Sequence, residues 1–182
     1  MEKIILLVVD MQKALVEAHP YQEREMIERV KGLIACCREK EIEVVYVRHD
    51  DGEGSELTRG MDGWQIDHQI APLESEIIFD KKYNSAFVKT GLKDYLNQKE
   101  VKTIILVGMQ TEYCIDATCK SAFEHGYKVI IPENTNTTFD NEYLTGEKLF
   151  EFYNYKIWNH RFTEVKSMEE VEALLKLNVQ ND

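Results

Sequence analysis

Positive charge is scarce in this chain. It carries 22 Lys and Arg residues against 33 Asp and Glu residues, its formal net charge is -11, and its basic residues form no run. Because duplex nucleic acid and anionic membranes bind basic patches, we expect neither as a partner. Long apolar runs are missing as well, and none approaches the ~20 residues of a membrane span. The apolar stretch near the start lacks a small-residue cleavage site, which favours a first strand over a signal peptide.

Cysteine is sparse and unpatterned. The four cysteines, Cys36, Cys37, Cys114 and Cys119, show neither zinc-ligand spacing nor a disulfide framework. Free thiols of this kind are typical of a reducing compartment, so we predict a cytoplasmic protein. The glycines form neither a G-x-G-x-x-G nor a G-K-[ST] loop, so nucleotide binding is not indicated and we expect no cofactor.

A regular alternation of strand and helix patterns is present. Without repeats or linkers, residues 1–182 are predicted to form one domain. Short β-branched runs predict strands, and apolar residues recurring at three and four predict helices. The alternation predicts an α/β fold, a doubly wound, mostly parallel six-stranded sheet with helices on both faces. The expected strands cover residues 3–9, 42–47, 76–79, 101–107, 128–131 and 155–158, and the expected helices cover 22–40, 141–152, 167–177 and the segments after Thr90 and Thr111.

The segment around Cys114 combines a buried strand, a sharp turn and a helix. Gly108 ends the strand, and Thr111 is a suitable N-cap for the helix. Cys114 would then lie in the first helical turn, where backbone N–H groups and the helix dipole favour a thiolate with a pKa below the ~8.5 of a free thiol. A small buried side chain that packs helix on sheet is the alternative, since most free cysteines are of that kind.

Three chemically useful residues follow three predicted strands. Asp10 closes the first strand, Lys81 follows the third, and Cys114 follows the fourth. In a doubly wound sheet these strand ends meet where ligands bind. Singly, each residue has a plain structural explanation: a turn cap, a solvated loop lysine and a core thiol. Together they favour a catalytic site with an acid, a base and a nucleophile.

Three motifs carry a resemblance to a known family. LLVVDMQ at 6–12, FDKKYNSAFVKTGLKDYL at 79–96 and LVGMQTEYCIDATCKSAFEHGYKV at 106–129 resemble the isochorismatase-like cysteine hydrolases, which include nicotinamidases and N-carbamoylsarcosine amidohydrolases. The resemblance implies a catalytic triad of Asp10, Lys81 and Cys114, with Lys82 as the alternative lysine. It also implies a cis peptide bond between Met109 and Gln110.

The same resemblance implies a reaction. The backbone N–H groups of Gln110 and Cys114 would form an oxyanion hole, and Cys114 would cleave a C–N bond of a small amide through a thioester. Isochorismatases proper lack the nucleophilic cysteine, so Cys114 argues against that branch. A catalytically silent domain that binds a small molecule without covalent chemistry stays open as the alternative.

A metal ion is not expected. Metal-dependent nicotinamidases carry a D-x-H motif after the second strand, where this chain reads VRHDD at 47–51. His49 with Asp51, or Asp67 with His68, would be the ligands if a metal were bound, but unpatterned His and Asp in a polar loop are usually solvated.

Four residues are candidates for substrate binding: Gln12, Trp64, Phe87 and Tyr113. Their aromatic rings favour a flat or cyclic acyl group. Trp64 is the first choice for specificity because it lies on the long polar loop over residues 48–71, whereas Phe87 has a core position as its alternative. Beyond the site, a homodimer or higher homo-oligomer is expected. We predict that its interface is formed by an aromatic cluster of Phe150, Tyr153, Tyr155 and Trp158. The alternative is that this cluster is part of the core of the monomer.

Overall fold

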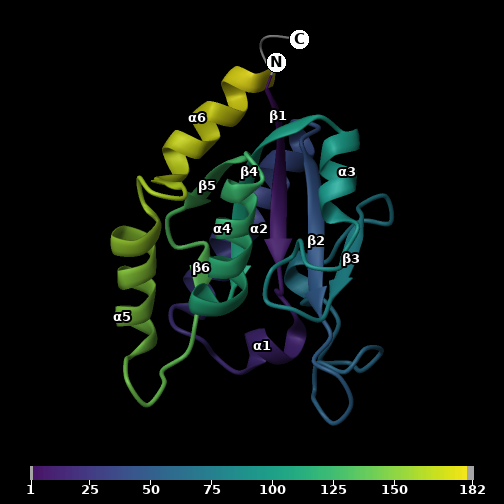
Figure 1. The fold of residues 1–182 in the computed structure, drawn as a ribbon, viewed down its shortest axis with the longest axis vertical. Helices are drawn as coiled ribbons and strands as arrows, with labels where there is room; N and C mark the ends of the chain where they lie inside the picture. The colour runs from purple at the N-terminus through teal and green to yellow at the C-terminus, as the bar shows by residue number, and fades with distance from the viewer. Residues whose placement is uncertain (1, 180–182) are drawn as a thin grey trace.

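The protein folds around a seven-stranded sheet. The computed structural model describes residues 2–179. The strand order is β3-β2-β1-β4-β5-β7, with β6 beside β4, and the pairings between the strands are parallel (Figure 1). This confirms the predicted α/β class, although two short strands, β6 and β7, were not predicted. The strands are β1 Lys3–Val9, β2 Glu43–His49, β3 Ile78–Lys81, β4 Val101–Met109, β5 Lys128–Pro132, β6 Asn136–Thr137 and β7 Glu164–Lys166.

Helices cover both faces of the sheet. Alternate residues of β1 enter two separate apolar cores, as a strand buried on both faces requires. One core packs against α1 Lys13–Glu17, α2 Glu23–Glu39 and α6 Met168–Val179; the other packs against α3 Leu92–Gln98, α4 Asp116–Glu124 and the π-helical segment Phe152–Trp158. The helix α5 Gly146–Glu151 runs into that π-helical segment. No described helix is long and apolar enough to cross a membrane.

The strand order reverses between β1 and β4. From β1 the chain winds outward through β2 and β3, and from β4 it winds outward in the opposite direction through β5 and β7. The helices that follow these two central strands therefore leave the sheet on different sides, which opens a crevice at the carboxyl ends of the strands. The strands β1 and β4, after which Asp10 and Cys114 follow in the sequence, both end at this edge of the sheet.

The predicted strand over residues 155–158 is wrong. This segment is π-helical, and the outer strand is β7, which pairs with β5. Asn154 and Trp158 are both buried, four residues apart, which is a helical spacing. The predicted helix over 141–152 begins late for a local reason: Asn141 accepts hydrogen bonds from the backbone of Tyr143 and Leu144, and this turn delays the helix.

The C-terminal aromatic cluster is mostly core. Phe150 is 4% exposed and Trp158 is fully buried, and the Trp158 indole donates to Asp116 Oδ1 at 2.8 Å. Of the four residues, only Tyr155 is largely exposed. The structure therefore supports the core explanation for Phe150 and Trp158. Homo-oligomerisation stays a prediction, and the aromatic cluster no longer supports it.

Candidate active site

The site lies where β1, β2, β3 and β4 end. Asp10 directly follows β1, His49 and Lys81 are the last residues of β2 and β3 and pair with each other in register, and Cys114 lies in the turn after β4. Lys81 belongs to a strand two positions away from β1, and its long side chain reaches past the end of β2 to Asp10. Strand order thus brings together residues that are far apart in the sequence.

Lys81 joins the other two predicted catalytic residues. Its Nζ donates to Asp10 Oδ2 at 2.6 Å and to Cys114 Sγ at 3.2 Å. The Lys81 side chain is fully buried and that of Asp10 is 2% exposed. The neighbouring Lys82 is exposed and pairs with Asp50 instead. The predicted proximity of the three residues is confirmed, and the spacing argument selected the lysine that reaches Asp10.

One oxygen of Asp10 has no partner. Lys81 holds Oδ2, whereas Oδ1 is buried without a hydrogen-bond partner among the described residues. A buried carboxylate oxygen without a donor is costly and is uncommon in folded proteins. It remains available as an acceptor, and the Cys114 sulfur lies within 4.8 Å of a carboxylate oxygen of Asp10.

The backbone on either side of the crevice is tightly constrained. Asp10 has a φ of 53°, which few non-glycine residues adopt. Beside it, Gly108 has a φ of 127°, and a Cβ at this position would lie 1.9 Å from the carbonyl oxygen of Val9. Only glycine allows β4 to approach β1 this closely. The Met109–Gln110 peptide bond that follows is cis, as the resemblance implies.

The turn that carries Cys114 is π-helical. It spans Thr111–Ile115 and continues into α4. Thr111 is not the predicted N-cap, because Gln110 precedes the turn in an extended conformation and the Thr111 hydroxyl donates to Asn136 Oδ1 at 2.8 Å. Asn136 in turn exchanges two side-chain hydrogen bonds with Asn154. The C-terminal third of the chain thus holds the nucleophile turn in place.

The Cys114 thiol is protonated at rest. Burial and the Asp10 carboxylate raise its pKa, the Lys81 ammonium opposes them in part, and the net result is a pKa of about 12. The low thiol pKa predicted from the sequence is therefore wrong. The prediction considered the helix end alone, but desolvation of the thiolate and repulsion by a buried carboxylate outweigh that effect here. A thiol with a raised pKa needs a base to take its proton before it can attack a substrate.

A cavity of about 200 Å³ opens onto Cys114. Its polar lining includes residues that the sequence reasoning did not place in a binding pocket. His49 was missed because the second strand was predicted to end at Val47, whereas β2 ends at His49. Asn84 was missed because the third strand was predicted to end at residue 79, whereas β3 ends at Lys81. The polar lining consists of Asp10, His49, Asp51, Asn84, Gln110 and Cys114. Apolar contacts come from Leu15, Leu57 and Met109, and Tyr113 contributes an aromatic ring.

The predicted oxyanion-hole donors lie at this cavity. Gln110 and Cys114 both line it. Within the described part of the chain, the Gln110 N–H has no hydrogen-bond acceptor. The Gln110 carbonyl faces the turn, where it accepts from the N–H groups of Tyr113 and Ile115. An unpaired N–H at the cavity is suited to stabilise an oxyanion.

Three of the four predicted substrate-binding residues are not in the cavity lining. Gln12 is fully buried, where its side-chain amide bonds the backbone of His49 and Trp64. Trp64 is 6% exposed, and the Arg48 guanidinium lies 3.6 Å from its ring centroid, so this indole anchors the loop instead of closing over a ligand. Phe87 packs against other rings in the core. Only Tyr113, which is 50% exposed, lines the cavity.

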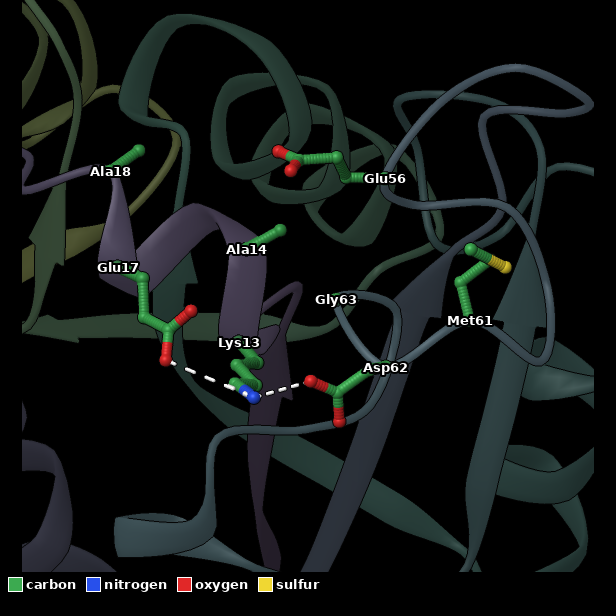
Figure 2. Close-up of a pocket in the computed structure, with 8 residues that line it drawn as sticks. All are labelled: Lys13, Ala14, Glu17, Ala18, Glu56, Met61, Asp62 and Gly63. Atoms are coloured by element: carbon green, nitrogen blue, oxygen red, sulfur yellow. Dashed lines mark hydrogen bonds and ion pairs between the residues drawn. The ribbon is translucent and has the colours of Figure 1, made fainter.

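The loop over residues 48–71 is fastened to α1. The backbone N–H groups of Lys13 and Ala14 donate to Gln65 and Gly63, and the Lys13 ammonium is held between Glu17 and Asp62 (Figure 2). These contacts border a second, larger cavity of about 420 Å³. Its lining contains neither a thiol nor a histidine, so it is not the candidate active site. The contacts around it fix the loop that forms one wall of the smaller cavity.

The donor set at the site does not suit a metal ion. Among the described residues, Asp10, His49 and Cys114 bring potential ligand atoms within 4.8 Å of one another. The Lys81 ammonium contacts all three, at 2.6 Å from Asp10, 3.1 Å from His49 Nδ1 and 3.2 Å from Cys114. A divalent cation would meet this buried positive charge at close range, which is unfavourable.

The two acid–histidine pairs considered from the sequence are also poor metal sites. His49 Nε2 lies 3.6 Å from Asp51, whereas its Nδ1 faces Lys81. Asp67 and His68 are 3.7 Å apart, but His68 is largely exposed and Asp67 accepts a hydrogen bond from the Gln69 backbone. That the protein needs no metal stays a prediction.

Comparisons with known proteins agree with the geometry. Residues 4–168 match the family model for the isochorismatase domain. Streptothricin hydrolase from Streptomyces noursei is 32% identical over 138 residues, or 74% of this chain, which spans only 50% of that protein. Nicotinamidase 3 from Arabidopsis thaliana is 28% identical over 151 residues, or 75% of this chain and 74% of its own length.

A solved structure shows the same fold. The crystal structure of an isochorismatase family protein superposes with a TM-score of 0.84 at 30% identity, covering 92% of this chain and 99% of its own. The match of the family model extends over all four strand ends that form the site and over both cores except the α6 residues Val171 and Leu175. The chain therefore belongs to the isochorismatase family of hydrolases.

Proposed function

We propose that the protein is a cysteine-dependent amidohydrolase that cleaves small amides at a C–N bond other than a peptide bond, with Asp10, Lys81 and Cys114 as its catalytic triad. The observation that carries this proposal is the buried Lys81 ammonium, which donates to both Asp10 and Cys114 at the floor of a cavity. That arrangement places a base and a nucleophile each within hydrogen-bond reach of one buried cation, with the nucleophile within 4.8 Å of the base, which suits covalent catalysis.

Acylation begins with the protonated thiol. The Asp10 carboxylate takes the proton from Cys114 as the sulfur attacks the amide carbon, so that the thiolate is used as it forms. The Gln110 and Cys114 N–H groups stabilise the oxyanion, an effect of a few kcal/mol per donor. Asp10 then returns the proton to the leaving nitrogen, and ammonia or an amine departs from a thioester at Cys114.

Deacylation uses the same groups in reverse. A water molecule loses a proton to Asp10 and attacks the thioester carbon, the C–S bond breaks, and the Cys114 thiolate regains its proton from Asp10. The products are a carboxylic acid and the free thiol. The Lys81 ammonium pairs with the Asp10 carboxylate in the resting site, so Asp10 is available as the base that begins each half-reaction. The nicotinamidase and streptothricin hydrolase relatives support a hydrolase of this general kind.

A screen of small amides tests the proposal. Nicotinamide, pyrazinamide, carbamoyl amino acids and ureido acids are followed by ammonia release, and lactams by formation of the acid. We expect turnover of at least one compound and a loss of at least ~10³-fold in kcat/KM on Cys114→Ala. Cys119→Ala is the matched control, because Cys119 is a buried core thiol on α4. Absence of turnover across the panel would favour the silent binding domain.

A further inference from the structure

The candidate cavity is unusual in its balance of charge. Its lining contains two acids, Asp10 and Asp51, and neither a lysine nor an arginine. Within residues 2–179, the lysine whose ammonium contacts the lining residues is Lys81, which bonds Asp10, His49 and Cys114. Whether the cavity accepts a charged substrate therefore depends on which of these charged groups already have a partner of opposite charge within the protein.

The Lys81 ammonium has no hydrogen left for a substrate. An ammonium group has three donors. Lys81 Nζ contacts Asp10 Oδ2, His49 Nδ1 and Cys114 Sγ, and its side chain is fully buried. Asp10 is thereby neutralised, and the described residues that line the cavity include no lysine or arginine to bind a carboxylate in the acyl part of a substrate. The His49 Nδ1 that faces this ammonium acts as its acceptor and offers the substrate no donor.

Asp51 is the unmatched charge of the cavity. Its carboxylate is 59% exposed and lies 3.6 Å from His49 Nε2, with no lysine or arginine partner among the described residues. The preceding Asp50 has different surroundings, since it pairs with Lys82 and accepts from the backbone N–H groups of Gly52 and Arg59. Asp50 therefore stabilises the loop, whereas Asp51 gives the cavity a net negative charge.

Building on the proposed function, we propose that the cavity selects small amides whose acyl part is positively charged or neutral and disfavours those with a carboxylate, and that Asp51 sets this preference. A cation at the cavity gains from Asp51 and meets the ring of Tyr113, which suits cation–π contact. A carboxylate meets Asp51, and the described lining of the cavity holds no lysine or arginine to compensate for the repulsion. The cavity of about 200 Å³ lies below the ~300–1,000 Å³ of typical ligand pockets, which limits the acyl group to a small one.

Charged thiol reagents test the cavity without requiring turnover. The 2-aminoethyl, propyl and 2-sulfonatoethyl methanethiosulfonates are cationic, neutral and anionic and deliver groups of similar size. Their rates at Cys114, followed by peptide mapping, are divided by their rates with N-acetylcysteine amide. We expect a normalised cation-to-anion ratio of about 10 or more. We expect Asp51→Asn to lower that ratio about fivefold, the scale of an exposed ion pair.

Glu56→Gln is the matched control. Glu56 lies on the same loop but lines the other cavity (Figure 2), and its substitution removes the same charge. We expect the ratio to stay as in the wild type. A ratio at or below one in the wild type, an unchanged ratio in Asp51→Asn, or an equal fall in Glu56→Gln would overturn the proposal. Circular dichroism of each variant verifies that it is folded.

Three amides of matched length extend the test to catalysis. β-Alaninamide is cationic, butyramide is neutral and succinamate is anionic. We expect kcat/KM to be lowest for succinamate, and we expect Asp51→Asn to narrow the gap between succinamate and β-alaninamide. If none of the three is turned over, they are compared as inhibitors of the best amide substrate, with the same order expected. Preference for succinamate overturns the proposal. Failure of the proposed function is a separate outcome: no amide is hydrolysed, and the thiol reagents still decide the charge preference.

Discussion

Removal of the Lys81 ammonium tests whether this residue holds the site together. In Lys81→Met an unbranched side chain of similar length keeps the volume and removes the charge. Asp10 would then be left ionised and buried without a partner, since its side chain is 2% exposed and Lys81 is its only ion pair within the described chain. Breaking a buried pair by removing one partner costs about 3–5 kcal/mol of unfolding free energy.

Urea unfolding measures the effect. The free energy of unfolding should fall by about 3–5 kcal/mol in Lys81→Met. Asp10→Asn should also be destabilised, because it leaves the ammonium unpaired. The double variant Asp10→Asn/Lys81→Met should be more stable than the sum of the two single losses predicts, by about 0.5–3 kcal/mol, since neither charge remains.

Lys82→Met is the control for this experiment. Lys82 lies next in the sequence, its side chain is 71% exposed, and it pairs with Asp50 at 3.4 Å. An exposed ion pair of this kind contributes at most about 1 kcal/mol. If Lys81→Met cost no more than Lys82→Met, or if the double variant showed no coupling, the argument that a buried charge pair organises the site would be refuted.

Three further predictions follow from the site. Alkylation of Cys114 by iodoacetamide should rise about tenfold per pH unit through pH 10, because the thiolate is the reactive form and the thiol pKa is raised from 9.0 to about 12; a plateau near pH 9 would contradict this. Gly108→Ala should not yield folded protein, since the added Cβ would lie 1.9 Å from the Val9 carbonyl, and a cooperative thermal transition like that of the wild type would show the reasoning to be wrong. Tyr113→Ala should raise KM, whereas Phe87→Leu should leave KM unchanged and lower stability by up to about 1.5 kcal/mol; the reverse pattern in kinetics and urea unfolding would restore Phe87 as a binding residue.

Much of the fold was predictable because buried residues recur at regular, short intervals along the sequence of each helix and strand. The helix over residues 22–40 was marked by apolar residues at intervals of three and four, and its apolar side is buried as α2. The strand predicted over 155–158 was wrong because this segment, Tyr-Lys-Ile-Trp, is too short for its apolar residues to distinguish a strand period from a helical one. Its conformation depends on Trp158 reaching Asp116, a contact between residues far apart in the sequence.

The site was partly predictable for a different reason. Asp10, Lys81 and Cys114 were found because strand ends converge in a doubly wound sheet, so topology alone brings them together. The surroundings of each residue were not predictable in this way. The pKa of Cys114 depends on burial and on Asp10, and the position of Trp64 depends on Arg48 lying over its ring. Both are properties of packing in three dimensions.

Trapping of the acylated enzyme tests the central claim most directly. The protein is mixed with an amide that it turns over, quenched with acid within the first turnovers, digested and analysed by mass spectrometry. The account predicts a mass increase equal to the acyl group on the peptide that carries Cys114. It also predicts that Cys114→Ala shows neither this adduct nor ammonia release above background. An acyl group on any other residue, or undiminished ammonia release by Cys114→Ala, would contradict the account.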